Sequence, residues 1–235
     1  MPQPQIVSIN MKNQPHYLGH RKRLKEKLRK DPSLLEDYEV LELLLGYAVP
    51  RKDTKPLAKE LLERFGSFKE ILFARASQFE QVPGIGQGIS TFWLLWREFW
   101  SRLEQSEFKP KTVLDSPTKV ARLARTRLSF LEVEEFWMIL VDTKNRLLAF
   151  EKICSGTVDQ APVFPREVIA RALELKASGL ILLHNHPGGD PRPSHQDFQL
   201  TRKLQAVARD LGLRVLDHII IGQDNYFSFQ EEGNM

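Results

Sequence analysis

Apolar side chains in the first half of the chain recur at the spacing of a helix. Three runs place them three and four positions apart, and these are 37–47, 56–65 and 89–103. That spacing gathers apolar groups on one helical face, and no run in this half alternates as a strand does. The pattern predicts an all-α domain over residues 17–107, in which Asp37 caps one helix and Gly66 ends another.

The pattern changes beyond residue 116, where β-rich runs alternate with helical ones. Helical runs follow Ser116, Phe164 and Ser194, and Ser116 and Ser194 are suitable helix caps. The strand-like runs are FWMILVD, RLLAFEKICSG, GLILLH, LRVLDHIIIG and NYFSF. Strands that are mixed with crossover helices predict an α/β domain over residues 116–235.

Two polar stretches complete the predicted domain organisation. Residues 1–16 are polar and aperiodic, so we expect a flexible N-terminus there. Residues 108–115 are polar and contain Pro110, which predicts a linker between the helical and the α/β domain.

The composition is that of an ordinary globular protein and excludes several other classes. Of 235 residues, 42% are hydrophobic and 27% are charged, which is not the balance of a disordered or a collagen-like chain. The single Cys154 cannot form an internal disulfide, which favours a reducing, cytoplasmic location. No apolar run approaches the ~18 residues of a membrane span, and residues 1–20 lack the apolar core of a signal peptide, so we expect no membrane partner.

The net charge of +4 lies wholly in the helical half. Residues 1–110 hold 18 Lys and Arg against 14 Asp and Glu, whereas the remainder holds 16 of each. Most of the excess is in GHRKRLKEKLRK, which includes Arg21, Lys22 and Arg23. A basic cluster of this kind favours a phosphate-bearing partner, and it is also typical of a solvated helix face.

The segment QVPGIG in the same half resembles the helix-hairpin-helix motif. Its two glycines allow a tight turn, and backbone N–H groups at the start of the next helix can hold a phosphate oxygen. Gly84, Ile85 and Gly86, together with Arg21, Lys22 and Arg23, are therefore candidate contacts to DNA, with Ile85 expected to pack into the core. No Lys or Arg closely follows Gly86, and such hairpins also serve as protein-binding or purely structural elements.

The segment LLHNHPGGDPRPSHQD carries the clearest chemistry. His184 and His186 end a buried strand two positions apart, so their imidazoles point the same way. Asp197 follows a Gly- and Pro-rich loop at the start of a helix capped by Ser194. Two His and one carboxylate form the three-ligand set of a catalytic zinc, with the fourth position left for water. We therefore expect one Zn²⁺ per chain.

The pattern His184-x-His186-Pro187, six residues, then Ser194-x-x-Asp197 resembles the JAMM (MPN-plus) metalloprotease signature. With PREV and LDHIIIG it resembles the RadC family over residues 19–229. The resemblance implies a deaminase-like α/β fold in which His184, His186 and Asp197 bind zinc and Ser194 stabilises a tetrahedral intermediate. Relatives usually have Ser where this chain has Gly188, which leaves the ligand set intact. His218 in LDHIIIG is expected to be a buried, hydrogen-bonded residue, because a fourth protein ligand would close the site.

The family also uses a glutamate from an early strand as general base, and two residues are candidates. Glu134 and Glu135 both directly precede FWMILVD. Relatives typically carry this Glu two residues before the aromatic residue that opens the strand, here Phe136, so the resemblance implies Glu134. A shift of one residue would select Glu135 and place its side chain on the opposite face.

Three functions remain open at the level of sequence. The resemblance implies a zinc metallopeptidase that cleaves a peptide or isopeptide bond in an unknown protein or peptide substrate. One alternative is a DNA-repair-associated nucleic-acid-binding protein whose zinc domain is structural or regulatory. The other is an inactive scaffold that keeps zinc only for structure. The oligomeric state is also open, because the aromatic run 89–103 suits either a core or a dimer interface.

Overall fold

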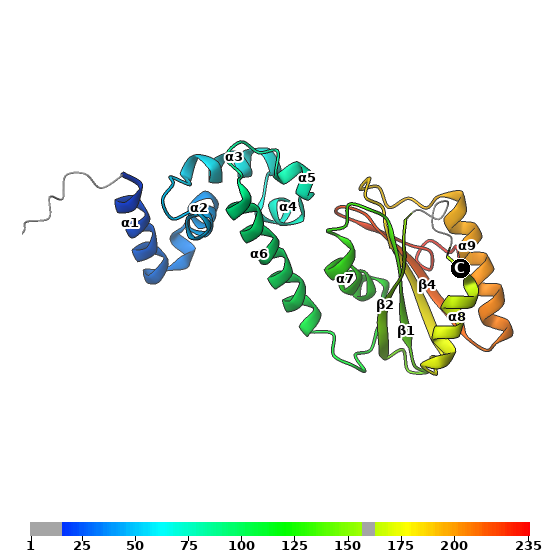
Figure 1. Ribbon diagram of the computed structural model, residues 1–235. Coiled ribbons are helices and arrows are strands. Elements are labelled where there is room, and N and C mark those ends of the chain that lie inside the picture. Colours follow the sequence, from blue (N-terminus) through cyan, green and yellow to red (C-terminus); the bar gives the residue numbers. More distant parts are fainter. Residues whose placement is uncertain (1–15, 157–162) are drawn as a thin grey trace, which may run out of the picture. The chain divides into compact units, whose positions relative to one another are not determined.

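The computed structural model describes residues 16–156 and 163–235, which form two compact units, Met1–Leu94 and Leu95–Met235. Figure 1 shows helices in the first unit and a sheet with helices in the second. The flexible N-terminus predicted for residues 1–16 lies outside the described residues except for His16, where the first helix begins. Across the described ranges, no helix is both long and apolar enough to cross a bilayer.

In its described part the first unit is helical, as the apolar spacing predicts. Its elements are α1 (His16–Lys30), a short 3-10 turn η2 (Pro32–Leu34), α2 (Asp37–Ala48), α3 (Lys55–Phe65), α4 (Phe68–Phe73), α5 (Ala76–Phe79) and the first turns of α6 (Gln87–Ser106). Gly66 ends α3 with a positive φ of 87°, a conformation that glycine adopts at no steric cost. Asp37 is the first residue of α2 and not its cap. The cap is Glu36, whose N–H donates to the Glu39 carboxylate at 3.0 Å.

The second unit is a mixed five-stranded sheet between two helical layers. Its elements are α7 (Pro117–Leu128), β1 (Glu135–Val141), β2 (Leu147–Ser155), α8 (Pro165–Glu174), β3 (Gly179–Asn185), α9 (His195–Asp210), β4 (Arg214–Ile221) and β5 (Tyr226–Ser228). The strand order is β2-β1-β3-β4-β5, in which only β3 and β4 are parallel. One apolar cluster joins the sheet to α7 and another joins it to α8 and α9, and Figure 1 shows these helices on opposite faces of the sheet.

Alternation along β1 and β3 decides which side chains meet α8 and α9. Phe136 and Met138 of β1 and Leu182 of β3 belong to the cluster under α8 and α9, whereas Ile139 and Ile181 belong to the cluster under α7. Successive side chains of a strand point to opposite faces, so even-numbered residues of both strands face α9. The last even-numbered residue of β3 is His184, which therefore points toward α9.

The segment 108–115, predicted as a linker, lies inside the second unit. Lys111 N–H donates to Leu147 O at 3.0 Å, and Leu114 N–H donates to Asn145 O at 2.9 Å. The Leu114 side chain is buried with α7. These backbone contacts to the β1–β2 hairpin explain why a polar, Pro-containing stretch is ordered here. The structure divides the chain within α6, after Leu94.

The aromatic helix α6 makes buried contacts in each unit. Trp93 stacks on Phe79 with ring centroids 4.2 Å apart, and its Nε1 donates to Ile71 O at 2.9 Å. In the second unit, Ser101 Oγ donates to Thr126 O. The exposed apolar residues of α6 are Leu94, Leu95, Phe99 and Leu103. The helix is therefore partly core, and the dimer alternative concerns only its exposed residues.

Candidate metal centre

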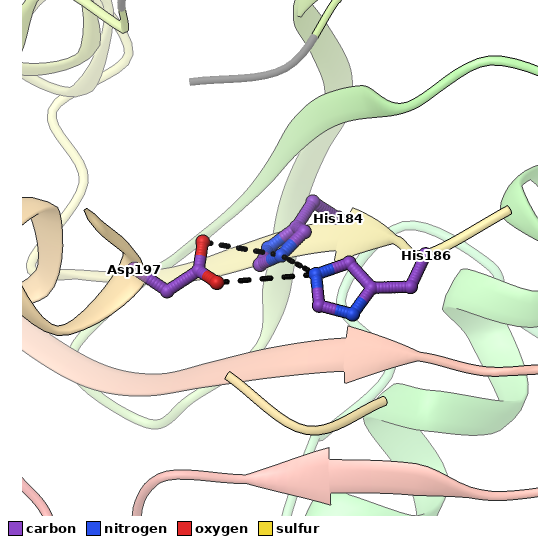
Figure 2. Close-up of side chains that lie close together, drawn as sticks. All are labelled: His184, His186 and Asp197. Carbon is purple, nitrogen blue, oxygen red and sulfur yellow. Dashed lines mark hydrogen bonds and ion pairs between the residues drawn. The ribbon is translucent and has the colours of Figure 1, made fainter. Parts of the chain in front are cut away.

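Three side chains converge where β3 ends and α9 begins. His184 Nε2 lies 3.0 Å from His186 Nε2 and 3.3 Å from Asp197 Oδ1, and His186 Nε2 lies 3.9 Å from Asp197 Oδ2. These residues form a group whose ligand atoms all lie within 4.8 Å of one another. Figure 2 shows both imidazoles and the carboxylate directed toward one point.

The spacing of these atoms fits a small tetrahedral cation. With zinc–ligand bonds of 2.0–2.1 Å, two ligands of a tetrahedral site lie about 3.3 Å apart. The observed contacts of 3.0, 3.3 and 3.9 Å bracket this value. Borderline-soft imidazole nitrogens with one carboxylate are ligands that zinc prefers. The donor set therefore fits the zinc ion expected from sequence.

Local sequence features hold each ligand in place. His184 is fully buried and stacks on Phe136 with ring centroids 4.5 Å apart. The N–H of His186 donates to Ile221 O at 2.9 Å, which ties the end of β3 to β4. Asp197 is the third residue of α9, where it completes a capping box with Ser194. Strand pairing and helix capping thus hold the ligands in place by contacts that do not require a metal.

A backbone carbonyl sets the tautomer of His186. Its Nδ1 lies 2.8 Å from Asp190 O. A carbonyl oxygen only accepts hydrogen bonds, so Nδ1 carries the proton and Nε2 keeps a free lone pair. That lone pair points at His184 and Asp197, as metal binding requires.

Burial keeps His184 neutral. Its ring is fully buried, and burial lowers the pKa of His184 well below its ordinary value, with His186 lowering it further. The neutral imidazole is the form that binds a metal. The environment therefore favours the ligand state of this residue.

Ser194 contacts the carboxylate of Asp197 directly. Its Oγ–H and its backbone N–H both donate to Asp197 Oδ2 at 2.7 Å, and its Oγ accepts from Asp197 N–H at 3.2 Å. Ser194 therefore holds Asp197 with Oδ1 turned toward His184. In this arrangement the hydroxyl proton of Ser194 is directed to Asp197. That Ser194 contacts a tetrahedral intermediate therefore stays a prediction.

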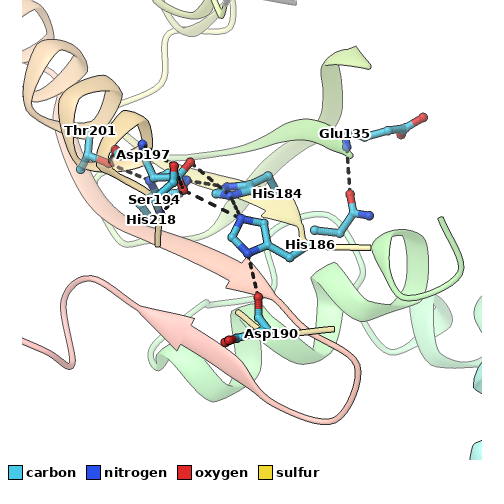
Figure 3. Close-up of polar contacts among 9 residues, drawn as sticks. Glu135, His184, His186, Asp190, Ser194, Asp197, Thr201 and His218 are labelled. Atoms are coloured by element: carbon cyan, nitrogen blue, oxygen red, sulfur yellow. Dashed lines mark hydrogen bonds and ion pairs between the residues drawn. The ribbon is translucent and has the colours of Figure 1, made fainter. Parts of the chain in front are cut away.

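The strand register predicts that the two candidate bases, Glu135 at the start of β1 and Glu134 directly before it, face opposite ways. Glu135 Oε2 accepts from Trp137 Nε1 at 2.9 Å and Oε1 pairs with Lys152 Nζ at 3.2 Å. Figure 3 shows the Glu135 carboxylate directed away from the histidines. Glu134 has the parity of Phe136, which pairs with His184 across β1 and β3. If that register continued by two residues, Glu134 would lie opposite His186 on the ligand face, and this position stays a prediction.

The pKa of the Cys154 thiol depends on the nearby charge of Glu134. Burial raises the pKa of this thiol above its ordinary value, and the negative charge of Glu134 raises it further, ahead of Glu167 and Glu135. We expect Glu134→Gln to lower the thiol pKa by more than Glu135→Gln does. The measurement is the pH dependence of alkylation of Cys154, with chelator present in every sample. An equal or larger shift in Glu135→Gln would contradict the assigned faces.

The loop 186–194, between β3 and α9, packs closely on the turn after β4. Gln223 N–H donates to Gly189 O at 3.0 Å, and a Cβ at Gly222 would lie 2.5 Å from Gly189 O. A Cβ at Gly188 would meet nothing within 4 Å, so the serine usual in relatives would fit there. The backbone oxygen of Gly189 thus leaves no room for a side chain at Gly222. At Gly188, by contrast, the exchange of the usual serine for glycine has no steric consequence.

We expect Gly222→Ala to destabilise the second unit by about 1–3 kcal/mol, as overpacking does. The new methyl group must displace either Gly189 or the β4–β5 turn. Gly188→Ala is the matched control and is expected to leave stability unchanged. Urea unfolding followed by circular dichroism measures both. Equal stability of the two variants would show that the loop moves freely.

The hairpin of the first unit forms the expected turn with a different core residue. Gly84 has φ 93°, and Ile85 N–H donates to Val82 O at 3.1 Å. Val82 and Ile89 are buried, whereas Ile85 is only half-buried and Gly86 is exposed. The expectation that Ile85 packs into the core is therefore corrected, since the fully buried apolar residues of the hairpin are Val82 and Ile89.

Of the basic residues assigned to DNA, Arg21 has a structural role. It is buried, and its guanidinium donates to Pro50 O and Lys52 O, both at 2.8 Å. These bonds tie α1 to the connection between α2 and α3, so these N–H groups are not available to a phosphate. Lys22 and Arg23 are exposed, and DNA binding by this unit stays a prediction.

Two residues beside the site were not singled out from sequence. Asn185, between the two histidines, accepts from Glu135 N–H at 2.9 Å and donates to Val133 O at 3.0 Å, so it fixes the start of β1. Thr201 lies 2.7 Å from His218. Strand alternation could have placed Asn185 opposite the histidine face, and the i+4 spacing from Asp197 could have indicated Thr201.

Comparison with protein families agrees with the geometry. The family model described as "RadC-like JAB domain" matches residues 114–234, a range that contains all three candidate ligands and both candidate bases.

Proposed function

Because this chain belongs to the RadC-like JAB domain family, we propose that it is a zinc-dependent metallopeptidase acting on a peptide or isopeptide bond. The coarser class, a metal-dependent hydrolase of the JAMM type, is suggested by the family together with the group of His184, His186 and Asp197. The convergence of these three ligands supports the proposal most strongly. A set of three protein ligands leaves one coordination position open for chemistry, whereas structural zinc sites are usually closed by four.

The residues around the site have distinct roles in the proposed reaction. His184, His186 and Asp197 would hold the metal, and bound zinc supplies a Lewis acid that makes water a nucleophile at neutral pH. Glu134, which directly precedes β1, is the residue proposed to take the proton of the attacking water and deliver it to the leaving nitrogen. Ser194 keeps Asp197 oriented through its backbone N–H and its hydroxyl group. The hydroxyl is proposed to turn from Asp197 to the developing oxyanion, while the backbone N–H keeps its bond to Asp197.

The proposal is tested by metal analysis combined with a hydrolysis screen. The full chain is purified in zinc-containing buffer and assayed against a peptide library and isopeptide-linked conjugates. We expect about one zinc per chain and hydrolysis that is lost with chelator and restored by zinc. A chain that stays metal-free in excess zinc, or hydrolysis that chelation does not affect, would refute the proposal.

A further inference from the structure

We propose that His218 and Thr201 are positioning residues that hold His184 in the tautomer required for metal binding. The inference rests on the metal centre of the proposed function. A hydrogen-bonded chain supports it, because the chain begins at one candidate ligand and returns to another. Figure 3 shows Thr201 and His218 beside Asp197 and His184.

The chain consists of three short contacts inside the second unit. His184 Nδ1 lies 2.9 Å from His218 Nε2, and His218 Nδ1 lies 2.7 Å from Thr201 Oγ1. Thr201 Oγ1 donates to the backbone oxygen of Asp197 at 2.6 Å. The exposed fractions of His184, His218, Thr201 and Asp197 are all 1% or less. Water therefore does not compete for these bonds.

The proton positions along the chain follow from the backbone carbonyl of Asp197, which can only accept a hydrogen bond. The carbonyl of Asp197 takes the single hydroxyl proton of Thr201. Thr201 Oγ1 must then accept from His218, so Nδ1 of His218 carries its proton and its Nε2 has a free lone pair. That lone pair accepts from His184 Nδ1–H. His184 is left with an unprotonated Nε2, which faces His186 and Asp197.

Aromatic rings fix the orientation of both histidines. His218 stacks on Phe229 with ring centroids 4.8 Å apart and planes 16° apart, and His184 stacks on Phe136 at 4.5 Å and 17°. The backbone of His218 is also bonded, because Phe229 N–H donates to its carbonyl at 3.0 Å. The stacked rings restrict rotation of each imidazole. The chain therefore fixes the direction of the His184 lone pair as well as its tautomer.

The same geometry distinguishes this role from two others. His218 bonds the Nδ1 side of His184, whereas the metal group uses the Nε2 side, so His218 is not a fourth ligand. If His218 only filled the core, removal of the buried hydroxyl group of Thr201 would leave zinc affinity unchanged. The positioning role predicts that this removal weakens zinc binding.

The deciding experiment measures zinc affinity of the full chain by competition with a chromophoric chelator. Loss of an outer hydrogen-bond partner typically lowers metal affinity 10–100-fold, and we expect a loss in this range for Thr201→Val. Thr201→Ser keeps the hydroxyl group and is expected to bind zinc within about 3-fold of wild type, on the same scale. The absorption spectrum of the Co²⁺-loaded protein should change in Thr201→Val and not in Thr201→Ser.

A matched control is available on the other face of the sheet. Thr126 of α7 is equally buried and donates to a backbone oxygen of its own helix, Leu123 O, at 2.7 Å. Thr126→Val therefore removes the same kind of bond without touching the metal group. Thr126→Val loses one buried bond where Thr201→Val loses two, so it should lower the melting temperature by less and leave zinc affinity unchanged.

The outcomes separate this inference from the proposed function. Wild-type zinc affinity and an unchanged Co²⁺ spectrum in Thr201→Val would overturn the positioning role alone. A wild-type protein that binds no zinc would overturn both proposals. If a variant does not fold, the ¹⁵N shifts of the wild-type imidazoles decide. They should show protonated Nδ1 on His184 and His218, and a protonated Nε2 on His218 would overturn the inference.

Discussion

Glu134→Gln is expected to abolish hydrolysis while zinc stays bound. A positioned general base contributes about 10²–10⁴-fold to a rate, and the amide of glutamine cannot take the proton of water at neutral pH. The change is nearly isosteric and lies outside the three-ligand group. Metal content and unfolding temperature should therefore match those of wild type. The measurement is kcat on a substrate from the hydrolysis screen, together with zinc per chain.

Glu135→Gln is the matched control for this prediction. Glu135 lies on the opposite face of β1, where it contacts Trp137, Lys152 and Ser155. Glutamine keeps an acceptor oxygen there, so we expect hydrolysis within about 3-fold of wild type, far less than the loss of a general base. The reverse result, an inactive Glu135→Gln and an active Glu134→Gln, would show that the strand register does not continue beyond Glu135.

His186→Ala is expected to remove the metal and the stabilisation that it provides. Two ligands remain, which is too few to hold zinc against the dilution of purification. A ligand present at 1,000 times its Kd stabilises the native state by about 4 kcal/mol. Added zinc should therefore raise the melting temperature of wild type and leave that of His186→Ala unchanged. His186 is partly exposed, so its truncation should not itself unfold the sheet.

His195→Ala is the control for the loss of an imidazole near the site. His195 is exposed and contacts Gln199 at 2.9 Å, outside the ligand group. Its variant should bind zinc and respond to it as wild type does. The same melts test the scaffold alternative, because a structural zinc predicts that chelation unfolds the second unit. We expect the metal-free unit to stay folded on its two apolar clusters.

The features that sequence could predict are local ones. Ser116 and Ser194 cap helices as predicted, and each side chain accepts from the N–H of the third residue after it. His184 and His186 point the same way because strand geometry has a period of two. The family match over residues 114–234 confirms the resemblance to RadC.

The features that sequence could not predict depend on distant partners. Arg21 has the sequence context of a surface cation, but its guanidinium is buried and donates to oxygens 25 to 33 residues away, among them the carbonyls of Pro50 and Lys52. The order in 108–115 comes from backbone bonds to the β1–β2 hairpin, which composition does not reveal. His218 was expected to be hydrogen-bonded, but its partners lie 34 and 17 residues away, and no local pattern names them.

The spacing of the ligands along the chain has a consequence for how the protein folds. His184, His186 and Asp197 lie within one short segment, and closing so small a loop costs little entropy. We therefore expect the unfolded chain to bind zinc weakly before the sheet forms. His218 reaches His184 only when β4 pairs with β3. The hydrogen-bonded chain that orients His184 is therefore absent when the unfolded chain binds zinc. We thus expect weak early binding and final tight binding to be separate kinetic events, the second of which requires the complete sheet.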